Sequence, residues 1–283
     1  MNTQETLLST ASSETSETSE TPKVSKVAVV EIFGPTIQGE GIMIGWKTMF
    51  IRFGGCDSRC GMCDSLHAVL PEAVKANSTY MTQDEIFEAV TKIAKPEQCE
   101  WVTLSGGNPA IWELGQLVSK LRVAGYQIAV ETQGTEWREW LKLCDLVTVS
   151  PKSPGMLEPK GWDQIAFEFM LEELYHEDAA VCVKIPIFSQ LDIEFAVGVE
   201  TCLHNMEMSS IIVKYLSVGN SHPPKLDPRR KQMLDSTVET NLVGNLLTDY
   251  RILLEQFLLD KRLPQWRFTP QLHVLLWGNK AGV

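Results

Sequence analysis

The sequence has no long apolar segment of the kind that a membrane helix or a secretion signal requires. Among its 283 residues, no stretch approaches the roughly 20 consecutive apolar residues of a membrane-spanning helix. Residues 1–22 contain no Lys or Arg and no apolar run, so the charged-then-apolar order of a signal peptide is also missing. These absences predict a cytoplasmic protein that has no membrane as a partner.

Positive charge is scarce as well. The chain has 25 Lys and Arg residues against 36 Asp and Glu residues, which gives a net charge of −11. Proteins that bind nucleic acids neutralise phosphates with basic surfaces, so this balance argues against a nucleic-acid partner. A small-molecule substrate suits the acidic composition better, and 44% apolar residues are enough to fill one large core.

The beginning of the chain lacks the side chains that a folded segment needs. Residues 13–21 repeat Ser-Glu-Thr three times without an aromatic residue. Such a segment cannot bury enough surface to offset the conformational entropy that it loses on ordering. We predict a disordered Ser/Thr/Glu-rich tail over residues 1–24 and a single folded domain over residues 25–283.

From Val27 onward, short apolar runs alternate with amphipathic stretches. Six β-branched runs are predicted strands, namely residues 48–53, 101–104, 128–131, 146–149, 181–188 and 210–216. Helices are predicted over residues 82–95, 114–124, 137–143 and 241–259. This alternation favours an α/β fold with parallel strands. Six strands suit a partial barrel better than a complete one, although a doubly wound sheet stays open on spacing alone.

Chemically distinctive segments directly follow four of these strands. They are residues 54–65 (GGCDSRCGMCDS), 105–109 (SGGNP), 132–134 (TQG) and 150–152 (SPK). Ligands of parallel α/β folds bind at the carboxyl ends of the strands, so we expect the four segments to share one rim. Each could also be an ordinary turn, because Gly-Gly, Asn-Pro and Ser-Pro are common turn sequences.

Cysteines are few, and three of the seven lie within eight residues. Cys56, Cys60 and Cys63 have C-x3-C-x2-C spacing, which in a reducing compartment indicates metal or redox chemistry. Three thiolates satisfy three irons of a [4Fe–4S] cube and leave the fourth iron open to S-adenosylmethionine. Structural zinc usually takes four ligands, and no second Cys or His pair lies near this loop, so the spacing favours the cluster.

Polar groups also precede the cysteine loop. In residues 31–41 (EIFGPTIQGEG), Gln38 and Glu40 offer the amide and carboxylate that a guanine-like edge requires. Arg52 lies within the apolar run of residues 48–53, where a surface salt bridge is less expected. Its guanidinium is suited to bind a carboxylate through two hydrogen bonds.

Together these motifs resemble those of a known family. A C-x3-C-x2-C loop with GGNP after a later strand resembles the radical S-adenosylmethionine superfamily. The segments GPTIQGEG, CDS, LSGGNPA, ETQGT, SPK and the ending LPQ…PQLHVLLWGNKAGV resemble the 7-carboxy-7-deazaguanine synthase family of queuosine biosynthesis. The resemblance runs from about Val29 to the end of the sequence.

The resemblance implies a partial (β6/α3) TIM-like barrel in a homodimer. The implied activity is that of a lyase, which contracts 6-carboxy-5,6,7,8-tetrahydropterin to 7-carboxy-7-deazaguanine with loss of ammonia. The implied cofactors are a [4Fe–4S] cluster, S-adenosylmethionine and Mg²⁺, with a flavodoxin or ferredoxin as electron donor. The resemblance also implies that a 5′-deoxyadenosyl radical would take hydrogen from the substrate, so the radical would come from the cofactor and no catalytic residue is assigned.

Carried over position by position, the resemblance assigns three kinds of ligand. The cluster would be held by Cys56, Cys60 and Cys63. The pterin substrate would be bound by Ile37, Gln38, Gly39, Arg52 (at its carboxylate) and Ser105. S-adenosylmethionine would be bound by Gly107, Ser150, Pro151 and Lys152, and Mg²⁺ by Ser65. The C-terminal segment would approach the substrate.

Three positions depart from the family's pattern. Ser65 stands where many relatives have Thr, so a hydroxyl for the metal is kept, although Asp-Ser also commonly caps a turn. Asn108 stands where the superfamily commonly has Glu, so an acceptor is kept and a charge is lost. Ser217 stands where many relatives have Gln, so no cosubstrate contact is assigned to it.

Two other functions remain open on the sequence alone. A glycyl-radical activase shares the cysteine spacing, but it acts on a partner protein and has no need of residues 34–41. A non-catalytic metal-binding module would hold an inert ion and leave S-adenosylmethionine intact. Turnover of a pterin without a partner protein would separate the predicted enzyme from both.

Overall fold

The computed structural model describes residues 25–156, 162–175, 179–221, 223, 241–280 and 282. The tail predicted over residues 1–24 lies outside these described residues. In the described part of the chain, no helix is both long enough and apolar enough to cross a membrane.

The described residues form one nine-stranded sheet with the order β3-β1-β2-β4-β5-β6-β7-β8-β9. The parallel strands are β2 (Lys47–Phe53), β4 (Trp101–Gly106), β5 (Gln127–Thr132), β6 (Leu146–Val149), β7 (Ala180–Ile187), β8 (Val213–Val218) and β9 (Trp266–Thr269). Two antiparallel strands, β1 (Val27–Ile37) and β3 (Thr79–Met81), extend the sheet beyond β2. The six predicted strands are the contiguous block of β2 and β4 to β8.

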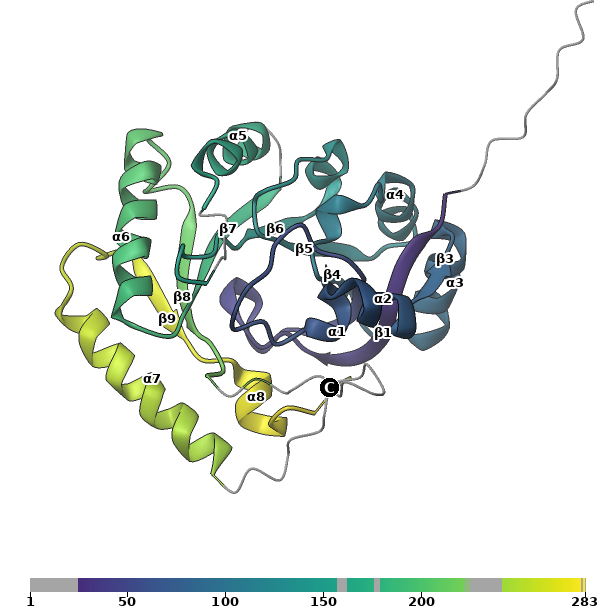
Figure 1. Ribbon diagram of the computed structural model, residues 1–283. Helices are drawn as coiled ribbons and strands as arrows, with labels where there is room; N and C mark the ends of the chain where they lie inside the picture. Colours follow the sequence, from purple (N-terminus) through teal and green to yellow (C-terminus); the bar gives the residue numbers. More distant parts are fainter. Residues whose placement is uncertain are drawn as a thin grey trace, which may run out of the picture.

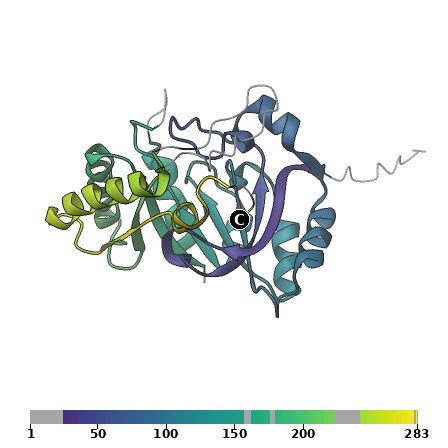
Figure 2. The same cartoon turned by 90° about the horizontal axis from the view of Figure 1, so that it is seen from below.

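The sheet curves around an interior that the loop after β2 enters (Figures 1 and 2). Among the described strands, the two at the edges, β3 and β9, do not pair with each other, so the barrel is open. The predicted fold class, an α/β partial barrel, is confirmed. β1, β3 and β9 lengthen the sheet beyond the strands that the sequence pattern predicts.

The longer helices cover the outer face of the sheet (Figure 1). The longer ones are α3 (Gln83–Ile93), α4 (Gly115–Val123), α5 (Gln164–Tyr175), α6 (Gln190–Asn205) and α7 (Leu242–Leu259). Shorter ones are η1 (Gly41–Met43), α1 (Leu66–Val69), α2 (Pro71–Asn77), η2 (Pro109–Ile111) and α8 (Leu272–Trp277). The helix predicted over residues 137–143 is a shorter 3₁₀ helix, η3 (Glu139–Leu143), and the sequence pattern does not predict α5 and α6.

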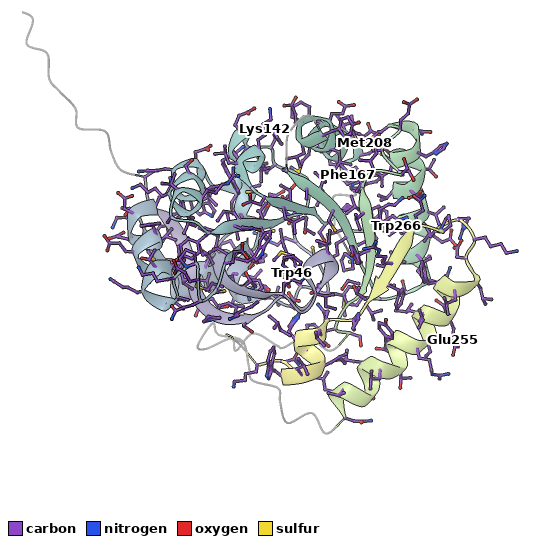
Figure 3. All side chains as sticks on the ribbon, turned by 180° about the vertical axis from the view of Figure 1, so that it is seen from behind. Trp46, Lys142, Phe167, Met208, Glu255 and Trp266 are labelled. Carbon is purple, nitrogen blue, oxygen red and sulfur yellow. The ribbon has the colours of Figure 1, made fainter. Side chains whose placement is uncertain are left out.

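Two faces of the sheet have different roles. The outward side chains, such as Ile51 and Leu104, are fully buried against the helices, and each stabilises the fold by roughly 1.5–3 kcal/mol. Phe167 of α5 lies in this layer (Figure 3), whereas Glu255 on α7 points into solvent. Alternate residues of the strands point inward, and there they line a cavity.

Candidate active site

The carboxyl ends of β2, β4, β5 and β6 surround one cavity of about 300 Å³. The four distinctive segments therefore share one rim, as the topology predicts. Pro151 is the one predicted site residue that does not line this cavity. The predicted residues that do are Ile37, Gln38, Gly39, Arg52, Cys56, Cys60, Cys63, Ser65, Ser105, Gly107, Ser150 and Lys152.

The cysteine loop follows β2 and is tied to the segment after β6. The backbone N–H of Gly61 donates to the Met156 carbonyl oxygen at 2.9 Å. Cys56, Cys60 and Cys63 are half-buried and have free thiols. Burial raises the pKa of the Cys63 thiol to about 12, and it raises the pKa of Cys60 as well. The Cys60 and Cys63 thiols therefore keep their protons at neutral pH until metal binding displaces those protons.

The donors on this loop suit a [4Fe–4S] cluster. The other thiols of the described residues, those of Cys99, Cys144, Cys182 and Cys202, are buried away from the cavity. Within the described ranges, no three His, Cys, Asp or Glu side chains converge closely enough to hold a single metal ion. A cube binds each of three thiolates at a separate iron, and this loop supplies that donor set.

Gly106 and Gly107 bring the end of β4 into backbone contact with the cysteine loop. Gly106 has a φ of +134°, and a Cβ on it would lie 2.1 Å from the Phe53 carbonyl oxygen. A Cβ on Gly107 would lie 1.9 Å from the Gly55 carbonyl oxygen. Any other residue would push the loop away, so packing within the chain already demands both glycines. The contact of Gly107 with S-adenosylmethionine stays a prediction.

Asn108 joins the ends of β4 and β5 to the cysteine loop. It is fully buried, and its Nδ2 donates to Asp57 Oδ1 at 2.8 Å. Its Oδ1 accepts hydrogen bonds from Thr132 Oγ1 (2.9 Å) and from the backbone N–H of Ala110 (3.2 Å). The departure from Glu at this position thus gives Asp57 a donor in place of a second carboxylate.

Arg52 on β2 is held by an acidic partner on β1. Its Nε lies 2.5 Å from Glu31 Oε1, and its Nη1 donates to Ser65 Oγ at 3.4 Å. Burial alone would raise the pKa of Glu31, but the hydrogen bond from His67 and the charge of Arg52 lower it to about 2. Because Glu31 engages Nε, the terminal nitrogens are left to face Ser65 and the cavity. There they can receive a carboxylate.

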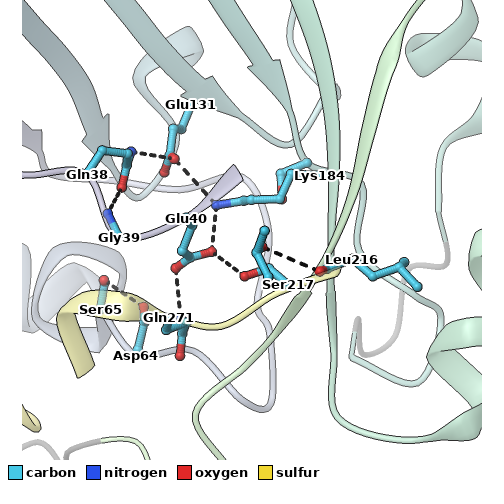
Figure 4. Close-up of polar contacts among 12 residues, drawn as sticks. Gln38, Gly39, Glu40, Asp64, Ser65, Glu131, Lys184, Leu216, Ser217 and Gln271 are labelled. Carbon is cyan, nitrogen blue, oxygen red and sulfur yellow. Dashed lines mark hydrogen bonds and ion pairs between the residues drawn. The ribbon is translucent and has the colours of Figure 1, made fainter. Parts of the chain in front are cut away.

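Ser65 directly precedes α1, where a hydroxyl commonly caps a helix. Its side chain makes no capping hydrogen bond. Instead its Oγ donates to Asp64 Oδ1 at 2.9 Å (Figure 4). Ser65 therefore does not cap the helix, which was the alternative role that the sequence left open. Ser65 lines the cavity instead.

Lys184 of β7 joins two carboxylates that are far apart in the sequence. Its Nζ lies 2.9 Å from Glu40 Oε2 and 3.4 Å from Glu131 Oε1 (Figure 4). Gln38 Nε2 also donates to Glu131 Oε1, at 3.0 Å. Burial lowers the pKa of Lys184, but the two carboxylates outweigh it and hold this pKa above its ordinary value. Burial likewise opposes ionisation of Glu40, but the charge of Lys184 brings its pKa to about 2.

Lys184 is not among the site residues that the sequence predicts. A signal was present, because this lysine interrupts the apolar run VCVKIPIF of a buried strand. A buried charge without a partner is costly, so a lysine in such a run indicates a carboxylate nearby. Ser217 of β8 also belongs to this cluster, since its Oγ donates to Glu40 Oε2 at 3.1 Å.

Two predicted ligand residues, Lys152 and Ser105, differ in whether their polar atoms have partners within the protein. Lys152 is half-buried, and its Nζ donates to the carbonyl oxygen (2.6 Å) and Oγ (2.7 Å) of Ser150. Burial lowers the pKa of Lys152. Ser105 Oγ is buried without a hydrogen-bond partner in the described structure, and Ser105 lines the cavity. A ligand in the cavity would satisfy this hydroxyl.

The C-terminal segment completes the polar end of the cavity. The backbone N–H of Leu272 donates to the Gly39 carbonyl oxygen at 2.9 Å. A Cβ on Gly39 would lie 1.9 Å from His273 Nδ1, so glycine is needed for this close contact. Gln271 Nε2 donates to Glu40 Oε1 at 2.8 Å. Residues 271, 273, 274, 278–280 and 282 line the cavity, in line with the expected approach of this segment.

Comparison with known proteins gives one consistent result. Residues 50–154 match the Radical SAM superfamily. The chain is 37% identical over 258 residues to 7-carboxy-7-deazaguanine synthase of Bacillus subtilis (strain 168), which covers 90% of this chain and 98% of that one. The enzyme of the same name from Bacillus cereus is 35% identical over 256 residues, with the same coverage. The crystal structure of QueE from Escherichia coli has a similar fold, with a TM-score of 0.59, 21% identity, and coverage of 88% and 95%.

Proposed function

Because the chain belongs to the 7-carboxy-7-deazaguanine synthase family of radical S-adenosylmethionine enzymes, we propose that it catalyses the reaction for which this family is named. Its substrate is 6-carboxy-5,6,7,8-tetrahydropterin. Its products are 7-carboxy-7-deazaguanine and ammonia, and the reaction serves queuosine biosynthesis.

One observation carries this proposal more than any other. The cysteine loop, the paired Arg52 and the polar cluster around Lys184 line a single cavity of about 300 Å³. A volume of this order suits a small heterocycle with one carboxylate. The Arg52 cation can bind the carboxylate at one end of such a molecule. The carboxylates of Glu40 and Glu131 can accept hydrogen bonds from N–H groups at its other end.

The residues of the chain bind and orient the pterin. Arg52, held by Glu31, binds the carboxylate through its terminal nitrogens. Ile37, Gln38 and Gly39 contact the ring, and the carboxylates held by Lys184 accept hydrogen bonds from its N–H groups. Ser105 adds a hydroxyl that has no partner within the described protein. Fixing the reacting carbon in this way lowers the entropy cost of the reaction.

The remaining predicted residues hold the cofactors. Cys56, Cys60 and Cys63 bind the [4Fe–4S] cluster, and the cluster together with S-adenosylmethionine supplies the one-electron chemistry. S-adenosylmethionine is bound by Gly107, Ser150, Pro151 and Lys152. Mg²⁺ would be held by the Ser65 hydroxyl together with substrate oxygens, since this ion prefers oxygen ligands and commonly keeps several waters.

Other parts of the proposal rest on the family resemblance and the composition. The electron donor is a flavodoxin or a ferredoxin, and the active form is a cytoplasmic homodimer. Neither nucleic acid nor membrane is a partner.

The test is anaerobic reconstitution of the full chain with iron and sulfide, followed by reduction and addition of S-adenosylmethionine, Mg²⁺ and 6-carboxytetrahydropterin. We expect mass spectrometry to detect 7-carboxy-7-deazaguanine without any partner protein. A cluster-loaded enzyme that cleaves S-adenosylmethionine but leaves the pterin intact would refute the substrate. A colourless protein with bound zinc would refute the enzyme and favour a metal-binding module.

A further inference from the structure

We propose that Gln133 donates a hydrogen bond to the sulfur of Cys56 when Cys56 ligates the cluster, and that this bond raises the cluster's reduction potential. Gln133 follows β5, and its Nε2 lies 3.3 Å from Cys56 Sγ. The inference rests on the proposed function only through the assignment of Cys56 as a cluster ligand.

Asp57 sets the direction of this hydrogen bond. Gln133 Nε2 also donates to Asp57 Oδ1 at 2.9 Å. An ionised carboxylate can only accept, so the amide must turn its NH₂ group, and not its oxygen, toward Asp57. The same NH₂ group has a second hydrogen for Cys56. A thiolate bound to iron has lost its proton, so its sulfur can only accept this hydrogen bond.

Asp57 itself is held in place by donors from two other segments. Thr135 Oγ1 donates to its Oδ2 at 2.5 Å, and Asn108 Nδ2 donates to its Oδ1 at 2.8 Å. The backbone N–H of Ala110 fixes the orientation of Asn108, because it must donate to the amide oxygen. A Glu in place of Asn108 could not donate to Asp57. Asn108, Thr135 and Asp57 are therefore positioning residues for Gln133.

A hydrogen bond to a cluster sulfur stabilises the reduced cluster more than the oxidised one, because reduction adds negative charge. The bond from Gln133 therefore makes the one-electron reduction of the cluster by its donor protein easier. Only the electron moves in this step, so no further reactant is needed. The effect belongs to the cluster alone and does not depend on which substrate the enzyme turns over.

The test compares Gln133→Leu with Gln127→Leu in the full, reconstituted enzyme without substrate and without S-adenosylmethionine. Gln127 begins the same strand at its opposite end, where its Nε2 donates to Glu100 Oε1 at 2.8 Å. The midpoint potential is measured by a redox titration followed by electron paramagnetic resonance. We expect Gln133→Leu to lower the equilibrium constant for reduction about tenfold, or about 59 mV for one electron, and Gln127→Leu to leave it unchanged.

A double-mutant cycle tests the positioning role without changing any charge. Thr135→Val removes one donor to Asp57, so we expect a smaller shift in the same direction. In the Gln133→Leu background it should add nothing, because the bond that it positions is already absent. A full additional shift in that background would overturn the positioning role.

Other outcomes decide the main proposal. An unchanged potential in Gln133→Leu, or an equal shift in Gln127→Leu, would overturn it. So would weaker binding of S-adenosylmethionine at an unchanged potential, which would assign Gln133 to the cosubstrate. If Gln133→Leu fails to retain iron, Gln133→Asn, whose amide is one methylene shorter, is titrated in the same way. Full iron content in Cys56→Ala would instead refute the cluster assignment of the proposed function.

Discussion

Two buried lysines on neighbouring strands make the same kind of ion pair on opposite faces of the sheet. Lys184 of β7 pairs with Glu40 and Glu131, and all three line the cavity. Lys214 of β8 pairs with Glu200 of α6 at 2.9 Å and also donates to the Ser209 carbonyl oxygen at 2.6 Å. Lys214, Glu200 and Ser209 do not line the cavity. Burial and pairing alone therefore do not identify a functional charge; what distinguishes Lys184 is that its partners face a space for a ligand.

The strongest contrast between the two faces is expected from their cysteines. Cys60→Ala removes one of three thiolates on the cavity side, so activity and most of the iron should be lost. Cys202→Ala on α6 removes a thiol that contacts Glu168 at 3.2 Å on the helical side, and both iron and activity should be retained. Iron per chain and turnover measure the contrast. Full activity in Cys60→Ala would contradict the prediction that the cysteine loop holds the cluster.

Replacing each lysine by Met should separate function from stability. For Lys214→Met we expect a loss of about 3–5 kcal/mol in the free energy of unfolding, since Glu200 is left unpaired. The folded fraction should keep its kcat. For Lys184→Met we expect, in addition to destabilisation, a fall in kcat/KM of about 100-fold, because misplaced acceptors no longer orient the substrate. Denaturant titrations and kinetics check both, and loss of kcat in folded Lys214→Met would break the distinction.

Acid should weaken the cavity side through Glu40. Its pKa falls from an ordinary 4.5 to about 2 in the folded protein. A carboxylate with a lowered folded pKa stabilises the protein above its unfolded pKa, and this stabilisation is lost as pH falls from about 4.5 to 2. Unfolding titrations across this range should show a shallower loss for Lys184→Met than for the wild type, and equal slopes would contradict the pairing.

Two hydroxyls that precede helices offer a smaller contrast. Thr82 caps α3 by accepting from the backbone N–H of Glu85 at 3.2 Å, whereas Ser65 makes no capping bond with α1. Thr82→Ala should cost about 1 kcal/mol of stability without changing turnover. Ser65→Ala should keep the stability but slow turnover about tenfold, and Mg²⁺ chelation should slow the wild type to a similar extent. Ser65→Thr should retain activity, and a Ser65→Ala enzyme with a normal Mg²⁺ response would exclude Ser65 as a ligand.

The smallest effect is expected from glycines. Gly198 lies within α6, and a Cβ there would meet no atom within 4 Å. Gly198→Ala should raise the free energy of unfolding by up to about 1 kcal/mol, because alanine favours a helix. Gly39→Ala on the cavity side should instead displace His273 and lower turnover. Thermal unfolding and steady-state kinetics of both variants test this comparison. An inactive Gly198→Ala variant would contradict a purely structural role for α6.

The sequence predicts the central strands well because they are buried on both sides and therefore read as short β-branched runs. It does not predict α5, whose sequence QIAFEFMLEELY is apolar around much of its circumference, so the helical period is masked. The segment between β5 and β6 is too short for a full helix with its two connections, and it forms the 3₁₀ helix η3.

The rim of the site is predictable because its segments directly follow strands, and strand direction then places them. The role of Lys184 is not predictable in this way, because it depends on two carboxylates from other segments. The need for glycine at positions 106 and 107 also comes from the tertiary structure, because the backbone of residues 53–55 leaves no room for a side chain. Local patterns do not encode such contacts between distant segments.

The hydrogen bond between Glu40 and Gln271 has a consequence for the order of folding. The two residues are 231 positions apart. Closing a loop of that length carries an entropy cost before any nearby contact offsets it, so the intervening parallel strands should assemble first. We therefore expect an interval during refolding in which the cysteine loop is seated while the polar end of the cavity is still open, which provides a route for iron. Pulsed hydrogen exchange should show late protection of the Leu272 amide, which bonds to Gly39.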